Sequence, residues 1–375
     1  MSRLKEDVDE YLRAIYYDPR KPSSYYSAAK IWSHIKTRAD RPSDLDYAGV
    51  KQWLTEQTTH SIHSTPKTNF QTEKIIVEAM DDQWDGDILQ LADLAGYNRG
   101  YKYLLLCIDL FSRYLWCRAL KSKTATETSR AFQDILDQGR QCDTFRTDQG
   151  NEFLGAPFQR VLKENNVSHM IAYGPHKAAY AERVNQTIEG RLYKYFYEKQ
   201  SFNYIDILND VIFSYNHTIH SSIGMAPADV TPDNSRQLYE RIYIPILNKR
   251  ARQTVTYAFD VGDLVRLSRA KTPFKRGYQE QWTEEIFKIC NRIPSHPPRY
   301  KVKDLADEII KGSFYEPELQ RVPLTNDPAD IQYKIERVIS TKKVGRQKLS
   351  LVKWYGYSAK FNSYVPTSQI QDYKR

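Results

Sequence analysis

Cysteine is scarce in this sequence, no long apolar run is present, and we expect no secretory leader. The four cysteines, Cys107, Cys117, Cys142 and Cys290, are widely separated and form no CxxC pair. Disulfide frameworks use more closely spaced cysteines, so we expect reduced thiols in a cytosolic or nuclear compartment. The chain begins MSRLKEDVDEYLRAI, without a signal-peptide core, and no run of 18 or more apolar residues follows. We therefore expect a soluble protein that is not secreted and has no membrane partner.

Positive charge is in excess only in the last third of the chain. The whole sequence has 55 basic and 46 acidic side chains, a formal net charge of +9. Residues 1–240 carry 29 basic and 32 acidic side chains, whereas residues 241–375 carry 26 and 14. A basic segment is drawn to phosphate backbones because binding releases counterions. The distribution favours a nucleic-acid partner, although a basic surface that serves only solubility gives the same count.

Three carboxylates stand in three different local contexts. Asp87 lies on an alternating strand in WDGDILQLADL, Asp148 ends a short strand in TFRTDQGNEF, and Glu182 lies in the helical stretch KAAYAERVNQTIEGRL. Carboxylates gathered from separate elements repel one another unless cations neutralise them, and hard oxygen ligands favour Mg2+ or Mn2+. The set therefore predicts a site for two metal ions, which is the arrangement used for phosphoryl transfer on nucleic acids.

The sequence around these carboxylates resembles the catalytic core of retroviral-type integrases and DDE transposases over about residues 80–230. The matching stretches are YKYLLLCIDLFSRYLWCRALKSKT, FRTDQGNEF, KAAYAERVNQTI and YNHTIHSSIGMAP. Several ordered motifs at compatible distances are more specific than any one of them alone. The pattern is most similar to the integrases of Maverick/Polinton elements and virophages. The resemblance implies an RNase H-like core in which Asp87, Asp148 and Glu182 are catalytic and bind two Mg2+ or Mn2+ ions.

Two further aspartates have to be separated from the catalytic set. Asp85 lies two residues before Asp87, so a strand directs both side chains to one face. The family pattern has an aromatic residue three positions before its first catalytic aspartate, and Trp84 thereby selects Asp87. Asp109, in LLLCIDLFSRY, has no metal role in the family and is interpreted as structural.

The helix that carries Glu182 also offers candidate contacts to DNA. If Glu182 faces the metals, Asn185 and Glu189 lie on the same side at i+3 and i+7. The resemblance implies that Asn185 positions DNA or the metal ligand, and Lys177, just before the helix, is a candidate phosphate contact. Gln186 stands where relatives often have a basic residue, so a phosphate contact is not expected there. Ordinary solvent exposure explains polar residues on this face equally well.

The fold class expected from the whole chain is multidomain α/β. Apolar spacing predicts a helical N-terminal domain over residues 1–70. The resemblance adds the RNase H-like core at 71–235, a linker at 236–257, an SH3-like DNA-binding domain at 258–325 and a chromodomain at 328–375. Retroviral integrases bind zinc near their N-terminus, but no CxxC follows the histidines of HSIH, so we expect no zinc here.

Basic residues cluster in one turn-rich stretch of the SH3-like segment. The cluster predicts contacts to the DNA backbone without sequence specificity. A solvated basic loop on a small barrel is the alternative for any one of these residues. The candidate residues are Arg266, Arg269, Lys271, Lys275 and Arg276.

The last fifty residues contain YKIERVISTKKVGRQKLSLVKWYGYSAKFNSYVP, which resembles a chromodomain. Tyr333, Trp354 and Tyr357 match the three aromatic positions that enclose a methylated lysine, where cation–π attraction holds the ammonium group. Phe361 stands where well-known chromodomains have an acidic residue. Aromatic side chains in a small sheet are also often simply core, so both interpretations stay open.

The resemblance implies a DNA integrase of a mobile element or virophage that acts in the host nucleus after synthesis in the cytoplasm. It would process the 3′ ends of element DNA and then join them to host DNA. The implied partners are element-end DNA, target DNA, methylated histone tails and further copies of the chain in a homo-multimer. Two alternatives remain: a nuclease of the same fold that only hydrolyses, and a domesticated chromatin-binding protein without catalysis.

Overall fold

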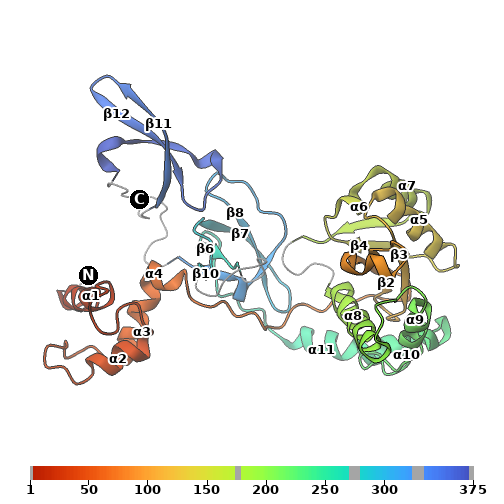
Figure 1. The fold of residues 1–375 in the computed structure, drawn as a ribbon. Helices are drawn as coiled ribbons and strands as arrows, with labels where there is room; N and C mark the ends of the chain where they lie inside the picture. The colour runs from red at the N-terminus through yellow and green to blue at the C-terminus, as the bar shows by residue number, and fades with distance from the viewer. Residues whose placement is uncertain (1–2, 174–178, 270–278, 323–332, 371–375) are drawn as a thin grey trace. The chain divides into compact units, whose positions relative to one another are not determined.

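The computed structural model describes residues 3–173, 179–269, 279–322 and 333–370. Contacts divide the chain into two compact units, whose elements are labelled in Figure 1. The core unit comprises residues 73–255 with 311–313, and the flanking unit comprises 1–72, 256–310 and 314–375. Among the helices of the described ranges, none is both long and apolar enough to cross a bilayer.

A mixed five-stranded sheet forms the centre of the core unit, with strand order β3-β2-β1-β4-β5. Strand β2 runs antiparallel to β1 and to β3, whereas β4 runs parallel to β1 and β5 runs parallel to β4. Parallel neighbours need a crossover, which the helices between these strands provide. The strands are β1 (Gln83–Gln90), β2 (Tyr103–Asp109), β3 (Leu115–Leu120), β4 (Thr144–Thr147) and β5 (Ser168–Ile171).

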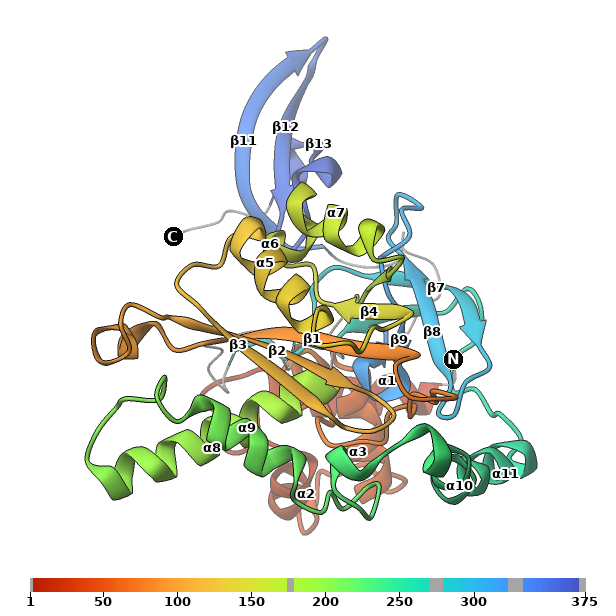
Figure 2. The same cartoon turned by 90° about the vertical axis from the view of Figure 1, so that its right-hand side faces the viewer.

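Helices cover both faces of this sheet, as Figure 2 shows edge-on. Leu105 of β2 packs into a cluster with Phe132 on one face, and Leu106 packs into a cluster with Ile188 on the other. Because successive strand residues point to opposite faces, burial on both sides explains why β2 reads as the apolar run YLLLCID. One face carries α5 (Ala125–Leu136), α6 (Asn151–Leu154) and α7 (Ala156–Glu164); the other carries α8 (Ala179–Lys199) and α9 (Leu208–Asn216).

The range expected to be a linker is largely helical. It contains most of α10 (Pro232–Ile242) and all of α11 (Ile244–Arg252). Leu238 and Tyr243 are buried in the same cluster as α8, and Arg250 Nη2 donates to the Lys74 carbonyl oxygen at 2.8 Å. The core unit therefore continues beyond the predicted boundary at residue 235, to residue 255.

The flanking unit begins with helices that surround a small apolar core. Leu12, Ile31 and Trp53 are buried together there, and the Trp53 indole nitrogen donates to Asp9 Oδ1 at 2.8 Å. Asp46 caps a helix by accepting from the Gly49 backbone nitrogen at 2.7 Å, as expected of an N-cap aspartate. The helices are α1 (Arg3–Tyr16), α2 (Ala28–Ile35), α3 (Tyr47–Glu56) and α4 (Thr58–Ser61).

Two further sheets complete the flanking unit. One has the order β10-β6-β7-β8-β9 and the other the order β11-β12-β13, with antiparallel neighbours in both. The Ile286 backbone nitrogen, just before β7, donates to the Tyr357 hydroxyl at 3.2 Å, so the two sheets are joined. The strands are β6 (Leu264–Leu267), β7 (Phe287–Ile293), β8 (Arg299–Lys303), β9 (Phe314–Tyr315), β10 (Leu319–Arg321), β11 (Ile335–Val344), β12 (Gln347–Trp354) and β13 (Ser363–Pro366).

A glycine in β1 allows the tight packing beside the catalytic candidates. A Cβ added at Gly86 would lie 2.1 Å from Cζ of Phe145, the β4 side chain that fills this space. Phe145 is fully buried, and its ring centroid lies 4.4 Å from that of Phe132. Close packing at this point holds β1 against β4 and α5, since interiors of this density leave no room for an extra methyl group.

We predict that Gly86→Ala destabilises the core unit by about 1–3 kcal/mol, because the new methyl group forces the Phe145 ring to move. The urea-unfolding midpoint, followed by tryptophan fluorescence, measures the loss. Gly190→Ala in α8 is the matched control, since nothing lies within 4 Å of its added Cβ and helical alanine is favoured over glycine by roughly 0.5–1 kcal/mol. Equal midpoints for the two variants would contradict this account of Gly86.

Candidate functional site

The register of two parallel strands brings Asp87 and Asp148 together. In the pairing of β1 with β4, Asp85 stands opposite Arg146. The same register, continued by two residues, places Asp148 beside Asp87, because Asp148 directly follows β4. The separation of Asp87 and Asp148 in the sequence therefore equals that of the paired residues Asp85 and Arg146. Burial raises the pKa of the Asp87 carboxyl, and repulsion from Asp148 raises it further.

Backbone and side-chain donors orient both carboxylates. Asp87 Oδ1 accepts from the Ile88 backbone nitrogen at 2.8 Å, and its Oδ2 accepts from Asn185 Nδ2 of α8 at 2.7 Å. Asp148 Oδ1 accepts from the Gly150 backbone nitrogen at 2.9 Å, which closes a turn of the kind that aspartate favours. Strand, turn and helix thus converge on one pair of carboxylates.

The third carboxylate lies on α8, about one helical turn before Asn185. Glu182 is exposed on the first turn of α8, three residues before Asn185 and on the same side of the helix. Within the described residues, no three acidic, histidine or cysteine side chains are close enough together to hold a metal ion. The structure therefore brings Asp87 and Asp148 together directly, and Glu182 is related to them through α8.

The donors around Asp87 fit a divalent cation. Asn185 Oδ1 is buried and has no hydrogen-bond partner, although buried oxygens of this kind are normally satisfied. That oxygen lies on the side chain that donates to Asp87, whose own neighbour is a second carboxylate, Asp148. Mg2+ prefers such hard oxygen ligands, and a bound cation would relieve the repulsion that raises the pKa of Asp87.

Asp85 and Asp109 are engaged in other interactions. Asp85 is fully buried and accepts from Arg146 Nε at 2.8 Å and Nη2 at 2.6 Å, which uses both of its oxygens. Asp109 is also fully buried, and it accepts from Arg140 Nη2 at 2.8 Å and from the Phe111 backbone nitrogen at 3.1 Å. Both aspartates therefore join elements of the core unit.

Sequence reasoning missed a charged pair beside the site. Lys123 Nζ lies 2.8 Å from Glu152 Oε1, and Glu152 is only 5% exposed. Burial lowers the pKa of Lys123, but Glu152 outweighs it, and the charges of Asp148 and Asp87 act in the same direction, so the pKa is raised. A Cβ added at Gly150 would lie 2.4 Å from Glu152 Oε1. Both residues lie in stretches that match the family, Lys123 in RALKSKT and Glu152 in DQGNE, but their separation in the chain gives no sign that they pair.

The structure changes the interpretation of the basic candidates in the flanking unit. Arg266 lies in β6 and is 3% exposed, and burial lowers the pKa of its guanidinium. Its side chain is therefore not part of an exposed basic patch, because β6 directs it inward. Arg269 is half-buried just after β6. The remaining candidates lie outside the described residues; they are Lys177, Lys271, Lys275 and Arg276.

The three aromatic candidates of the C-terminal sheet lie together. The Tyr333 ring centroid is 5.9 Å from that of Trp354 and 5.6 Å from that of Tyr357. Tyr333 and Trp354 are half-buried, whereas Tyr357 is buried. Phe361 stands where well-known chromodomains have an acidic residue. Its ring centroid lies 5.5 Å from that of Tyr357. A cluster of this kind offers ring faces to a cation.

We predict opposite effects for the two neighbouring aspartates of β1. Asp87→Asn should leave stability unchanged or raise it by about 1 kcal/mol, because it removes repulsion and its amide can pair with Asn185 Oδ1. Asp85→Asn should cost about 3–5 kcal/mol, because it leaves the Arg146 guanidinium buried without a counter-charge.

Thermal unfolding with and without MgCl2 measures both effects. MgCl2 should raise the midpoint of the wild type and of Asp85→Asn, but not that of Asp87→Asn, because ligand binding stabilises only a chain that retains the site. A magnesium-dependent shift of equal size in Asp87→Asn would exclude Asp87 as a ligand.

Comparison with known proteins places these residues in context. A family model described as an integrase core domain matches residues 78–172. The transposon-derived protein F54H12.3 of Caenorhabditis elegans is 33% identical over 226 residues, which cover 58% of this chain and 75% of that protein. The retrovirus-related Pol polyprotein from transposon 297 of Drosophila melanogaster is 22% identical over 204 residues, covering 52% of this chain and 19% of the polyprotein.

A solved structure resembles the chain over most of its length. A chain of the simian T-cell lymphotropic virus intasome, in complex with PP2A regulatory subunit B56 gamma, aligns with a TM-score of 0.51 and 16% sequence identity. The alignment covers 79% of this chain and 98% of the viral one. At this identity the similarity is one of fold.

Proposed function

Because this chain belongs to the family of retroviral and transposon integrases, we propose that it joins the DNA of a mobile element to host DNA. Its core unit is the RNase H-like integrase core that the sequence resemblance implied. The proposed element is of the Maverick/Polinton or virophage kind, and the proposed place of action is the host nucleus. The supporting observation is the carboxylate pair of Asp87 and Asp148, held in register by β1 and β4.

Asp87 and Asp148 are the proposed ligands of two Mg2+ or Mn2+ ions, with Glu182 as the third. Such ions, when bound, activate an attacking oxygen and stabilise the leaving oxygen in phosphoryl transfer. Asn185 orients Asp87 through its amide and has a further oxygen available for a ligand. Lys123 lies close enough to both aspartates for their charges to raise its pKa, so it adds positive charge where phosphate would arrive.

The proposed reaction has two phosphoryl transfers. In the first, water attacks a phosphodiester near the end of the element DNA and releases the terminal nucleotides, which leaves a 3′-hydroxyl on the element. In the second, this hydroxyl attacks a phosphodiester of target DNA, and a target 3′-hydroxyl leaves. Neither transfer needs a covalent protein intermediate, because positioning and electrostatic stabilisation carry the catalysis.

The flanking unit is proposed to hold element-end DNA and target DNA in a homo-multimer of the chain. We interpret residues 1–70 as an N-terminal helical domain and the sheet β10-β6-β7-β8-β9 as an SH3-like DNA-binding domain. Exposed Lys288 and Lys301 on neighbouring strands add to Arg269 as phosphate contacts, and Arg266 is withdrawn from that set because it is buried. We retain Lys177, Lys271, Lys275 and Arg276 as proposed contacts.

The sheet β11-β12-β13 is proposed to be a chromodomain that binds a methylated histone tail. Tyr333 and Trp354 meet edge to face, with Tyr357 behind them. Because the Tyr357 hydroxyl already accepts from Ile286, a methylated ammonium would approach between the two half-buried rings. The energetic gain comes from cation–π attraction in a partly desolvated site.

We predict that Asp148→Asn lowers both end cleavage and strand transfer by roughly a thousandfold or more, about 4 kcal/mol of barrier. The charge of a metal ligand is lost, while the amide oxygen keeps the turn to Gly150. The assay uses paired element ends with a target plasmid and Mg2+, and it separates cleaved from joined products.

The same assay separates this function from its alternatives. Cleavage without joined products by the wild type would favour a nuclease that only hydrolyses. Absence of both products, with DNA binding intact, would favour a chromatin-binding protein without catalysis. Wild-type levels of strand transfer by Asp148→Asn would refute the metal assignment.

We predict that the full chain binds a trimethyl-lysine histone peptide roughly tenfold more tightly than the unmodified peptide, on the order of 1–2 kcal/mol. Trp354→Ala should abolish this preference and leave strand transfer on naked DNA unchanged. Tyr364→Ala is the control, since this exposed aromatic residue of β13 lies outside the cluster. Indistinguishable binding of the two peptides across several histone sites would leave Trp354 as a core residue.

A further inference from the structure

A pocket of about 310 Å3 lies on the other face of α8 from the carboxylate site. The helix contributes Tyr180, Arg183 and Arg191 to its lining. Since an α-helix turns about 100° per residue, this face is roughly opposite the one that carries Glu182 and Asn185. The other walls come from β2, the turn after it, α9 and the segment that follows α9; they include Ile108, Arg113, Tyr215, Thr218 and His220.

The lining of this pocket is strongly positive. Three of the lining residues are arginines, Arg113, Arg183 and Arg191, and none is acidic. In the part of the chain that the structure describes, none of these guanidiniums forms an ion pair with a carboxylate. Burial lowers the pKa of His220, and the charges of Arg113 and Arg183 lower it further. The local potential therefore favours an anion.

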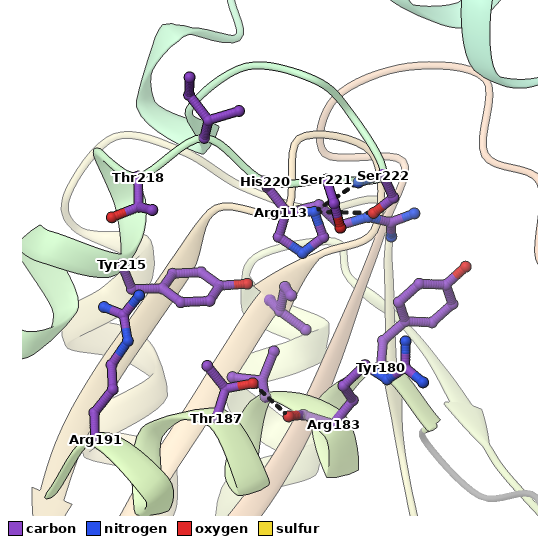
Figure 3. Close-up of a pocket in the computed structure, with 13 residues that line it drawn as sticks. Arg113, Tyr180, Arg183, Thr187, Arg191, Tyr215, Thr218, His220, Ser221 and Ser222 are labelled. Carbon is purple, nitrogen blue, oxygen red and sulfur yellow. Dashed lines mark hydrogen bonds between the residues drawn. The ribbon is translucent and has the colours of Figure 1, made fainter. Parts of the chain in front are cut away.

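Two buried polar atoms in the lining have no partner. Arg113 is 5% exposed and Tyr215 is 6% exposed, yet Arg113 Nε and the Tyr215 hydroxyl make no hydrogen bond. Leaving such a group buried and unsatisfied costs about 1–3 kcal/mol, so a bound acceptor would stabilise both donors. Figure 3 shows His220, Ser221 and Ser222 facing the α8 residues across the pocket, with the Tyr215 hydroxyl directed between them.

The backbone at Arg113 also carries strain at this position. Its φ angle is +65°, in the left-handed region that residues with a side chain rarely adopt. This conformation places the guanidinium 4.3 Å from the centroid of the Tyr180 ring, which also lines the pocket. Strained residues of this kind cluster at ligand sites, because the surrounding fold holds them in place for binding.

We propose that this pocket is a second, metal-independent site that binds the phosphate of a nucleotide. Guanidinium groups bind phosphate oxygens through charge-assisted hydrogen bonds, and Arg113 Nε and the Tyr215 hydroxyl would gain the partners they lack. The rings of Tyr180 and Tyr215 and the side chain of Ile108 offer apolar surface to a base or sugar. The choice of a nucleotide among phosphate-bearing ligands rests on the proposed function in DNA joining.

Isothermal titration of the full chain in EDTA tests the proposal. A 5′-mononucleotide should bind, and the matching nucleoside should bind at least about tenfold more weakly because it lacks the phosphate. The double variant Arg183→Gln, Arg191→Gln should lose about tenfold or more in affinity for the mononucleotide. Arg160→Gln, an exposed arginine on α7, is the matched control and should bind as the wild type does.

The outcomes separate this site from the catalytic one. Asp148→Asn should keep full nucleotide binding while it loses DNA joining. Nucleotide binding by the wild-type chain, together with no joined DNA products from that same chain, would sink the proposed function and leave the pocket standing. Equal binding of nucleotide and nucleoside, or equal losses in Arg160→Gln and in the double variant, would overturn the site. Inorganic phosphate that binds as tightly as the nucleotide would overturn its assignment to a nucleotide.

Competition identifies the source of the phosphate. Displacement of the mononucleotide by a 5′-phosphorylated single-stranded oligonucleotide, but not by the same strand without its phosphate, would support the site and assign it to a DNA end. Displacement by neither strand, with mononucleotide binding intact, would support the site and assign it to a free nucleotide. Displacement by both strands equally in the wild type and in the double variant would count against the pocket as the binding site.

Discussion

The parallel pairing of β1 with β4 is the constraint on which the candidate site depends. The buried ion pair between Asp85 and Arg146 joins these two strands and uses both carboxylate oxygens. A one-residue slip would move every side chain of a strand to the other face of the sheet. Since such a slip would leave two buried charges unpaired, the ion pair specifies the register that places Asp148 beside Asp87. Gly86 and Phe145 support the same register from the opposite face.

Helix α8 connects two sites of different chemistry. One face presents Asn185 to Asp87 and carries Glu182, where negative charge accumulates and a cation is favoured. The other face presents Arg183 and Arg191 to a pocket where positive charge accumulates and an anion is favoured. Apolar residues between these faces, such as Ile188, bury the helix against the sheet. A ligand bound at either face would therefore contact the same helix, whose position is set by its packing against the sheet.

Burial, more than residue type, decides which of the charged candidates can contact a ligand. Arg266 and Arg269 are close in sequence and equally basic, but β6 directs the first into the flanking unit and leaves the second partly accessible. Asp85 and Asp87 differ in the same way, because one is paired with Arg146 and the other has a carboxylate neighbour. A charged side chain can act on a ligand where the fold leaves it without a full set of partners. Such a side chain destabilises the fold more strongly the more it is buried from water.

From the sequence alone came the resemblance to the integrase family and the choice of Asp87 and Asp148 as candidate ligands, because the motifs that carry them are local. The strand register that sets the two side by side is seen only in the fold. Tertiary structure alone decided the rest. Lys123 meets Glu152, and Arg113 meets Tyr180, across distances in the chain that no local pattern encodes. The burial of Arg266 and the extension of the core unit through α11 likewise follow from packing between distant segments. Local periodicity specifies which face a side chain occupies, whereas only the assembled fold specifies what covers that face.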